Sequence, residues 1–140
     1  MDEIKRTVDE INQLIQTQSW FDFDLLSYLK FELKIVGGID IFYPLKIDSG
    51  DLVITFSNIF YISSLSGWST DTSKNCLKVL EGEEFYKMNI KYQVTQGNYI
   101  FIFSIEDYKE ELFYIIAENI SYEISNPSRF RTFCHLQASK

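Results

Sequence analysis

A period-two alternation of apolar and polar residues begins near residue 25 and recurs through most of the chain. Leu29, Phe31, Leu33 and Ile35, for example, are separated by charged residues. This alternation is typical of β-strands that bury one face and expose the other. The chain must therefore build a sheet with one buried side.

One helical pattern precedes the strands. Ile4, Val8, Ile11, Leu14 and Ile15 recur at steps of three and four, which predicts an amphipathic helix over residues 3–17. Polar and charged residues cover the opposite side of this helix. We expect the helix to dock on the sheet by its apolar stripe.

Two hairpins are predicted. The first pairs residues 25–36 with 39–47 around Gly37-Gly38, a typical two-residue turn. The second pairs residues 86–95, where Met88, Ile90 and Tyr92 alternate with polar residues, with residues 99–106.

The remaining segments complete a strand-rich fold. Leu52, Ile54, Phe56, Phe60 and Ile62 share one phase and predict a strand. Further predictions are an irregular stretch over 63–75, a short helix over 76–80 that Gly82 ends, a strand over 112–124 and a last strand in the tail.

These elements predict an α+β fold in which the N-terminal helix packs on a mostly antiparallel, strongly curved sheet or small sandwich of six to seven strands. We expect one domain over residues 1–140, consisting of the helix, a strand-rich part over 25–125 and a basic tail over 126–140.

The net charge of the chain is −7, and it is unevenly distributed. Residues 1–24 contribute −4, residues 25–80 contribute 0, residues 81–124 contribute −6 and the tail contributes +3. Nucleic acid and anionic membrane are therefore poor partners, whereas a basic protein suits the charge. The alternative is that acidity only keeps the protein in solution.

The sequence predicts a cytoplasmic protein. No apolar run approaches the roughly 20 residues that span a bilayer, and the acidic N-terminus has no signal-peptide core behind it. Cys76 and Cys134 are expected to be reduced thiols rather than a disulfide.

Residue chemistry predicts no catalytic site, no metal site and no cofactor. His135 is the only histidine, and Cys134 beside it would point to the opposite face of a strand. The two cysteines and the histidine have no zinc-type spacing, and Gly37-Gly38 lacks the residues of a phosphate-binding loop. We expect a non-enzymatic protein.

Acidic turns and one tryptophan are the candidate partner-binding residues. The tryptophan could be an exposed anchor beside the acids, as could Tyr61 and Tyr86, or it could fill a gap in the core beneath its loop. The candidates are Trp68, Asp71, Glu81, Glu83, Glu84, Glu106, Asp107, Glu110 and Glu111.

The stretches 52–62, LVITFSNIFYI, and 112–124, LFYIIAENISYEI, resemble strands of small bacterial immunity proteins from polymorphic-toxin and contact-dependent inhibition systems. The order of helix then strands and the acidity are similar too. The resemblance implies a cytosolic protein that binds one cognate toxin domain, commonly a nuclease, and blocks its active site or another essential surface.

The leading hypothesis is therefore a non-enzymatic immunity protein that neutralises a basic toxin domain through its acidic surface. One rival is an enzyme or small-ligand module with an aromatic-lined pocket, and another is a structural homo-oligomer. The sequence does not set the oligomeric state.

Overall fold

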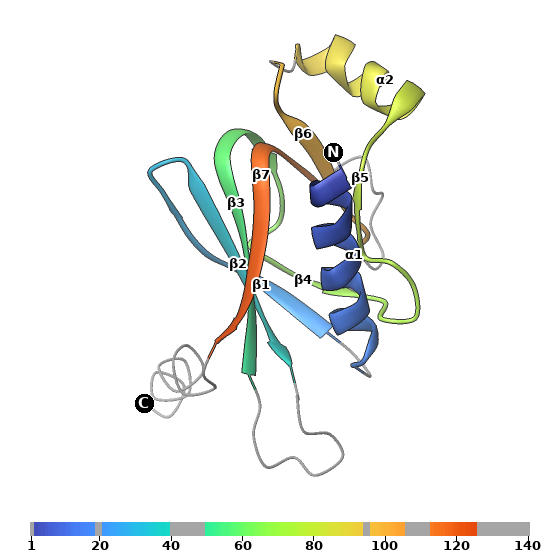
Figure 1. The fold of residues 1–140 in the computed structure, drawn as a ribbon. Coiled ribbons are helices and arrows are strands. Elements are labelled where there is room, and N and C mark those ends of the chain that lie inside the picture. Colours follow the sequence, from blue (N-terminus) through green and yellow to red (C-terminus); the bar gives the residue numbers. More distant parts are fainter. Residues whose placement is uncertain (1, 19–20, 40–49, 94–95, 106–112, 126–140) are drawn as a thin grey trace.

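The computed structural model describes residues 2–18, 21–39, 50–93, 96–105 and 113–125. Within them, seven antiparallel strands form one sheet in the order β4-β1-β2-β3-β7-β6-β5, which curls into a half-barrel (Figure 1). The elements are α1 (Asp2–Gln16), β1 (Phe21–Leu29), β2 (Glu32–Ile39), β3 (Gly50–Ser63), β4 (Gly67–Thr70), β5 (Leu77–Val79), α2 (Gly82–Tyr92), β6 (Tyr99–Phe103) and β7 (Tyr114–Ser125). The predicted α+β class with a curved sheet is confirmed.

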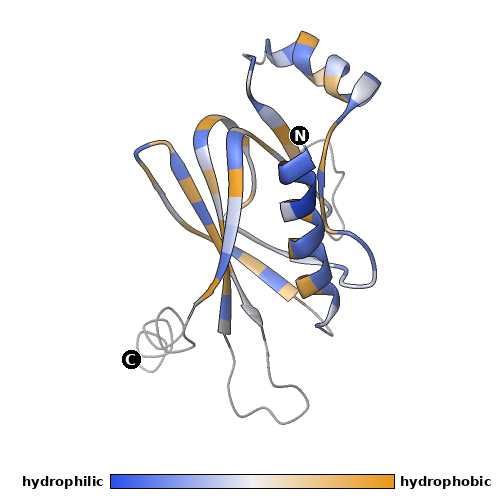
Figure 2. Cartoon of the chain, viewed as in Figure 1, coloured by the Kyte–Doolittle hydropathy of each residue, from blue (hydrophilic) through white to orange (hydrophobic). Residues whose placement is uncertain are grey.

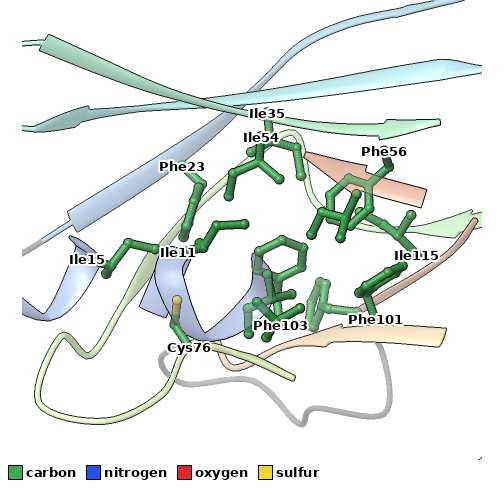
Figure 3. Close-up of a cluster of buried hydrophobic side chains, with 14 of the residues drawn as sticks. Ile11, Ile15, Phe23, Ile35, Ile54, Phe56, Cys76, Phe101, Phe103 and Ile115 are labelled. Carbon is green, nitrogen blue, oxygen red and sulfur yellow. The ribbon is translucent and has the colours of Figure 1, made fainter. Parts of the chain in front are cut away.

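Helix α1 lies on the concave side of this sheet, as its apolar stripe predicts. Ile4, Val8, Ile11 and Ile15 of this stripe are buried in the main core, while Leu14 is partly buried against it. Figure 3 shows Ile11 and Ile15 directed toward the strands. The predicted helix over residues 3–17 differs from the observed one by a single residue at each end.

Aromatic rings fill the space between α1 and the strands. The Phe103 ring lies 5.5 Å from Phe23, 6.1 Å from Phe56 and 5.2 Å from Trp68, in each case nearly edge-on. Edge-on pairs at these distances add to the free energy of burial, because the positive ring edge meets the negative ring face. Side chains thus occupy the concave side of the half-barrel.

A buried amide ties α1 to the edge strand β5. The Asn12 side-chain carbonyl accepts hydrogen bonds from the backbone N–H groups of Cys76 and Leu77, both at 3.1 Å, and its Nδ2 donates to the Leu77 carbonyl at 2.8 Å. An edge strand leaves backbone groups unpaired, and Asn12 satisfies three of them.

The first hairpin turns earlier than predicted. Its turn is Lys30-Phe31, where φ is 54° and 63°, and β1 and β2 pair on either side. The predicted turn at Gly37-Gly38 is wrong, since both glycines lie within β2. Gly37 faces the Phe21 ring, which occupies the space that a side chain would need. The predicted return strand over 39–47 lies mostly outside the described residues.

Gly37→Ala is expected to lower the free energy of unfolding by about 2 kcal/mol, because overpacking of a filled core costs roughly 1–3 kcal/mol. The added Cβ would clash with the Phe21 ring and come within 2.8 Å of the Asp22 carbonyl oxygen. Urea unfolding measures the change. Phe21→Ala in the Gly37→Ala background should be less costly than Phe21→Ala alone, and simple additivity of the two changes would contradict this account.

The second predicted hairpin is wrong in its first half. Residues 86–92 belong to helix α2, whose Phe85, Met88 and Tyr92 pack on the outer face of the sheet. The predicted helix over 76–80 is instead strand β5, and Gly82, with φ of 59°, precedes the helix rather than ending one. The stretch 63–75 contains the short strand β4.

Strands β3 and β7 are confirmed where they were predicted. In the second half of β3, however, different side chains face the core than the alternation predicted. Leu52, Ile54 and Phe56 face the core, but Asn58 has a φ of 56°, and after it Ile59 rather than Phe60 packs on the core. The pairing with β7 shifts register between Ile59 and Tyr61. Such a bulge turns the following side chains over, so Phe60 faces outward.

Candidate partner-binding surface

Exposed apolar side chains gather at one end of the half-barrel. The described residues include eight large apolar side chains that are well exposed, and Ile124 alone among these eight lies elsewhere. We call the other seven the apolar band. Its members are Tyr28, Leu29, Phe31, Phe60, Tyr61, Tyr86 and Ile90.

The band has three parts, on the β1–β2 hairpin tip, on β3 and on α2, and two contacts link them. The Ile59 N–H donates to the Phe31 carbonyl at 3.0 Å, which joins the hairpin tip to the bulge of β3. The Tyr61 and Tyr92 ring centroids are 5.0 Å apart, which joins β3 to α2. In Figure 1 the β1–β2 tip, the bend of β3 and α2 all lie toward the top of the view, and Figure 2 shows apolar residues at the tip and along α2.

The hairpin tip exposes apolar side chains on an unfavourable turn. Leu29 is 70% exposed and Phe31 66% exposed. The left-handed backbone at Lys30 and Phe31 suits Asn or Gly, and each other residue there costs roughly 1 kcal/mol. Neither stability nor solubility explains Phe31 at this position. Features of this kind are typical of functional surfaces.

Helix α2 is apolar on two sides. None of its residues is fully buried, although Phe85 and Met88 rest against the sheet. Tyr86 and Ile90, one turn apart on the other side, are 65% and 80% exposed. A helix that only covered the sheet would not need apolar residues on its outer face.

Three tyrosines hold α2 against the sheet. The ring centroids of Tyr61, Tyr92 and Tyr114 are 5.0 to 5.6 Å apart. A hydrogen bond from Tyr114 lowers the pKa of Tyr92. Burial, followed by the same hydrogen bond, raises the pKa of Tyr114. Burial and this hydrogen bond thus oppose ionisation of the Tyr114 phenol, and the ring contacts fix the position of α2 on the sheet.

Three of the acidic residues predicted to bind a partner have local contacts in the structure. Lys5 Nζ lies 2.7 Å from Glu81 Oε1, and Lys78 Nζ lies 3.8 Å from Glu84 Oε2. Asp71 accepts hydrogen bonds from the hydroxyl and the backbone N–H of Ser73, which lower its pKa. Two of the acids are thus partly neutralised by lysines.

The other predicted residues are not brought together in the described part of the chain. Glu83 is exposed in the first turn of α2. Trp68 is only 6% exposed and packs among Phe23 and Phe103, so it fills the core and is not an exposed anchor. Tyr61 and Tyr86 are exposed, as an anchor requires. The predicted residues Glu106, Asp107, Glu110 and Glu111 lie outside the described residues.

The described part of the chain contains one cysteine, Cys76, and it is buried. Burial raises the pKa of the Cys76 thiol to about 12, so the thiol remains protonated and is a poor nucleophile. Among the described residues, no group of three or more His, Cys, Asp or Glu side chains is placed to hold a metal ion. Cys134 and His135 lie outside these residues.

The described part of the chain contains no helix with the length and apolar character needed to cross a membrane. Comparisons with models of known protein families, with curated protein sequences and with solved structures found no match to this chain.

Proposed function

We propose that this protein is a non-enzymatic immunity protein that binds and neutralises a cognate toxin domain, and that the apolar band is its contact surface. The observation that carries the proposal is the gathering of seven exposed apolar side chains at one end of the fold. Apolar side chains concentrated on one exposed surface are typical of protein–protein contacts.

The size of the band suits a protein partner. Seven such side chains expose about 800 Å² in total, close to what each partner contributes to a standard stable interface. The hairpin and the tyrosine cluster also hold the band in place before binding, which reduces the entropy lost on association.

The charge of the described residues gives secondary support. They include 14 acidic and eight basic side chains, a net charge of −6. This surplus favours approach by a basic toxin domain and rapid encounter at low salt. The rival pocket hypothesis receives less support, because α1 and aromatic rings occupy the concave side of the sheet.

The test uses the product of the open reading frame adjacent to this gene. Co-expression with this protein should relieve the toxicity of that product, and the two should co-purify. Leu29→Asp combined with Phe31→Asp should abolish protection and weaken binding by about 100-fold, since two apolar side chains that the partner would cover are lost.

A matched control is Ile124→Asp, because Ile124 is exposed on β7 but lies outside the band. This variant should protect as well as the native protein does. Equal loss of protection in both variants, with both folded by circular dichroism, would refute the assignment of the contact to the band. An adjacent gene product that neither harms the cell nor binds would refute the immunity function.

A further inference from the structure

We propose that the apolar band recognises an apolar protein surface bordered by carboxylates. This inference rests on the proposed function and adds the chemistry of the contact. It differs from the expectation of a purely acidic contact surface, because three exposed lysines border the band.

Three lysines border the band. Lys30 lies between Leu29 and Phe31 at the hairpin tip, and Lys87 and Lys91 flank Ile90 on α2. All three are exposed, and none of them forms an ion pair with a described residue. The Lys91 ammonium lies 5.2 Å from the centroid of the Tyr92 ring. These cations remain available to an incoming partner.

Two acids lie close to the band along its strands, and one of them has a lysine partner. Glu32, which pairs with Leu29 across the hairpin, lies 3.8 Å from the Lys34 ammonium. Glu118 accepts a hydrogen bond of 2.9 Å from the Asn58 amide. Glu118 keeps its negative charge in that bond, and Glu83 is a second exposed acid, one turn before Lys87 on α2. The three lysines outnumber these two acids, although the whole chain carries −7.

A second copy of this chain fits the band less well than a different protein. A two-fold contact between bands would place the three lysines of each copy in one interface, and like charges there cost free energy. Carboxylates on a partner would instead pair with these lysines at the border of an apolar contact. The expected arrangement is an apolar centre with a charged rim.

The experiment uses two synthetic amphipathic helical peptides as probes. They share one apolar face and differ only in the residues that flank it, glutamate in one and lysine in the other. Fluorescence anisotropy measures their dissociation constants for the full-length protein. The glutamate peptide should bind about tenfold more tightly. The negative net charge of the chain would by itself favour the lysine peptide.

Single charge reversals identify the source of this preference. Lys30→Glu and Lys87→Glu should each reduce the preference for the glutamate peptide by about threefold or more. Lys74→Glu is the control, because Lys74 is exposed beside Asn75, which contacts Gln16 at the far end of α1. This control should leave the preference unchanged.

Tighter binding of the lysine peptide, equal binding, or no binding of either peptide would overturn the inference. A band-dependent dimer in sedimentation analysis of the protein alone would also overturn it, in favour of a second copy. None of the peptide results would touch the immunity function, which depends on protection from the adjacent gene product. A band-dependent dimer would count only against the band as the toxin contact surface.

Discussion

Replacing Asn12 by aspartate is expected to lower the free energy of unfolding by about 3–5 kcal/mol at neutral pH, the range measured when a buried charge is left uncompensated. Asn12 is only 4% exposed, and both ends of its amide are used. A carboxylate keeps the two backbone N–H donors but loses the donor to the Leu77 carbonyl. It would face that carbonyl oxygen with a buried negative charge.

The Asn12→Asp effect should depend on pH in one direction. Burial raises the pKa of the new carboxyl in the folded state above its unfolded value, so stability is lost as pH rises through the folded pKa. Acidification from pH 7 to 5 should therefore recover part of the loss, because a protonated carboxyl can again donate to Leu77.

Urea unfolding of Asn12→Asp, monitored at several pH values, measures both effects. Gln13→Glu makes the same amide-to-carboxylate change on the exposed side of α1 and should cost less than about 0.5 kcal/mol. A loss in Asn12→Asp no larger than in Gln13→Glu would mean that Asn12 does not hold β5 to α1.

Phe103→Ala is expected to cost about 3–5 kcal/mol, the usual loss when a buried phenylalanine is removed. The ring of Phe103 contacts Phe23, Phe56 and Trp68, which come from three other strands. Its removal leaves a cavity that those strands can close only by shifting relative to one another.

Thermal and urea unfolding measure the Phe103→Ala loss. The matched control is Phe60→Ala, which removes the same atoms from an exposed side chain and should cost less than about 1 kcal/mol. Similar losses in the two variants would show that the aromatic cluster is not the main source of packing energy in the half-barrel.

The elements that could be predicted from sequence carry one repeated signal over many residues. Helix α1 shows five apolar residues in register, and strands β3 and β7 are long and rich in β-branched and aromatic side chains. Both patterns match only one kind of secondary structure over that length.

The errors occurred where two patterns fit the same residues. In residues 86–92, Met88, Ile90 and Tyr92 alternate like a strand, but Phe85, Met88 and Tyr92 also follow a helical spacing. Glu83 and Glu84 in the first turn and Lys91 in the last turn match the helix dipole, a signal that favoured the helix. The hairpin turn was missed because Lys30-Phe31 is not a usual turn sequence.

The apolar band could not be predicted because it depends on which side chains the fold leaves uncovered. Trp68 is buried since the curled sheet brings it onto Phe23 and Phe103, which lie far from it in sequence. Phe60 is exposed since the bulge after Asn58 reverses its phase. Acidic residues were visible in the sequence, but their pairing with Lys5 and Lys78 was not.

Hydrogen exchange of the complex with the adjacent gene product tests most directly whether the apolar band is the contact surface. Binding should slow the exchange of amides in residues 28–32, 59–62 and 86–92, while amides in residues 71–75 exchange as in the free protein. Slowed exchange around Asp71 and Glu81, with no change of exchange in residues 28–32 and 86–92, would contradict the account. The contact would then lie at the acidic turns instead.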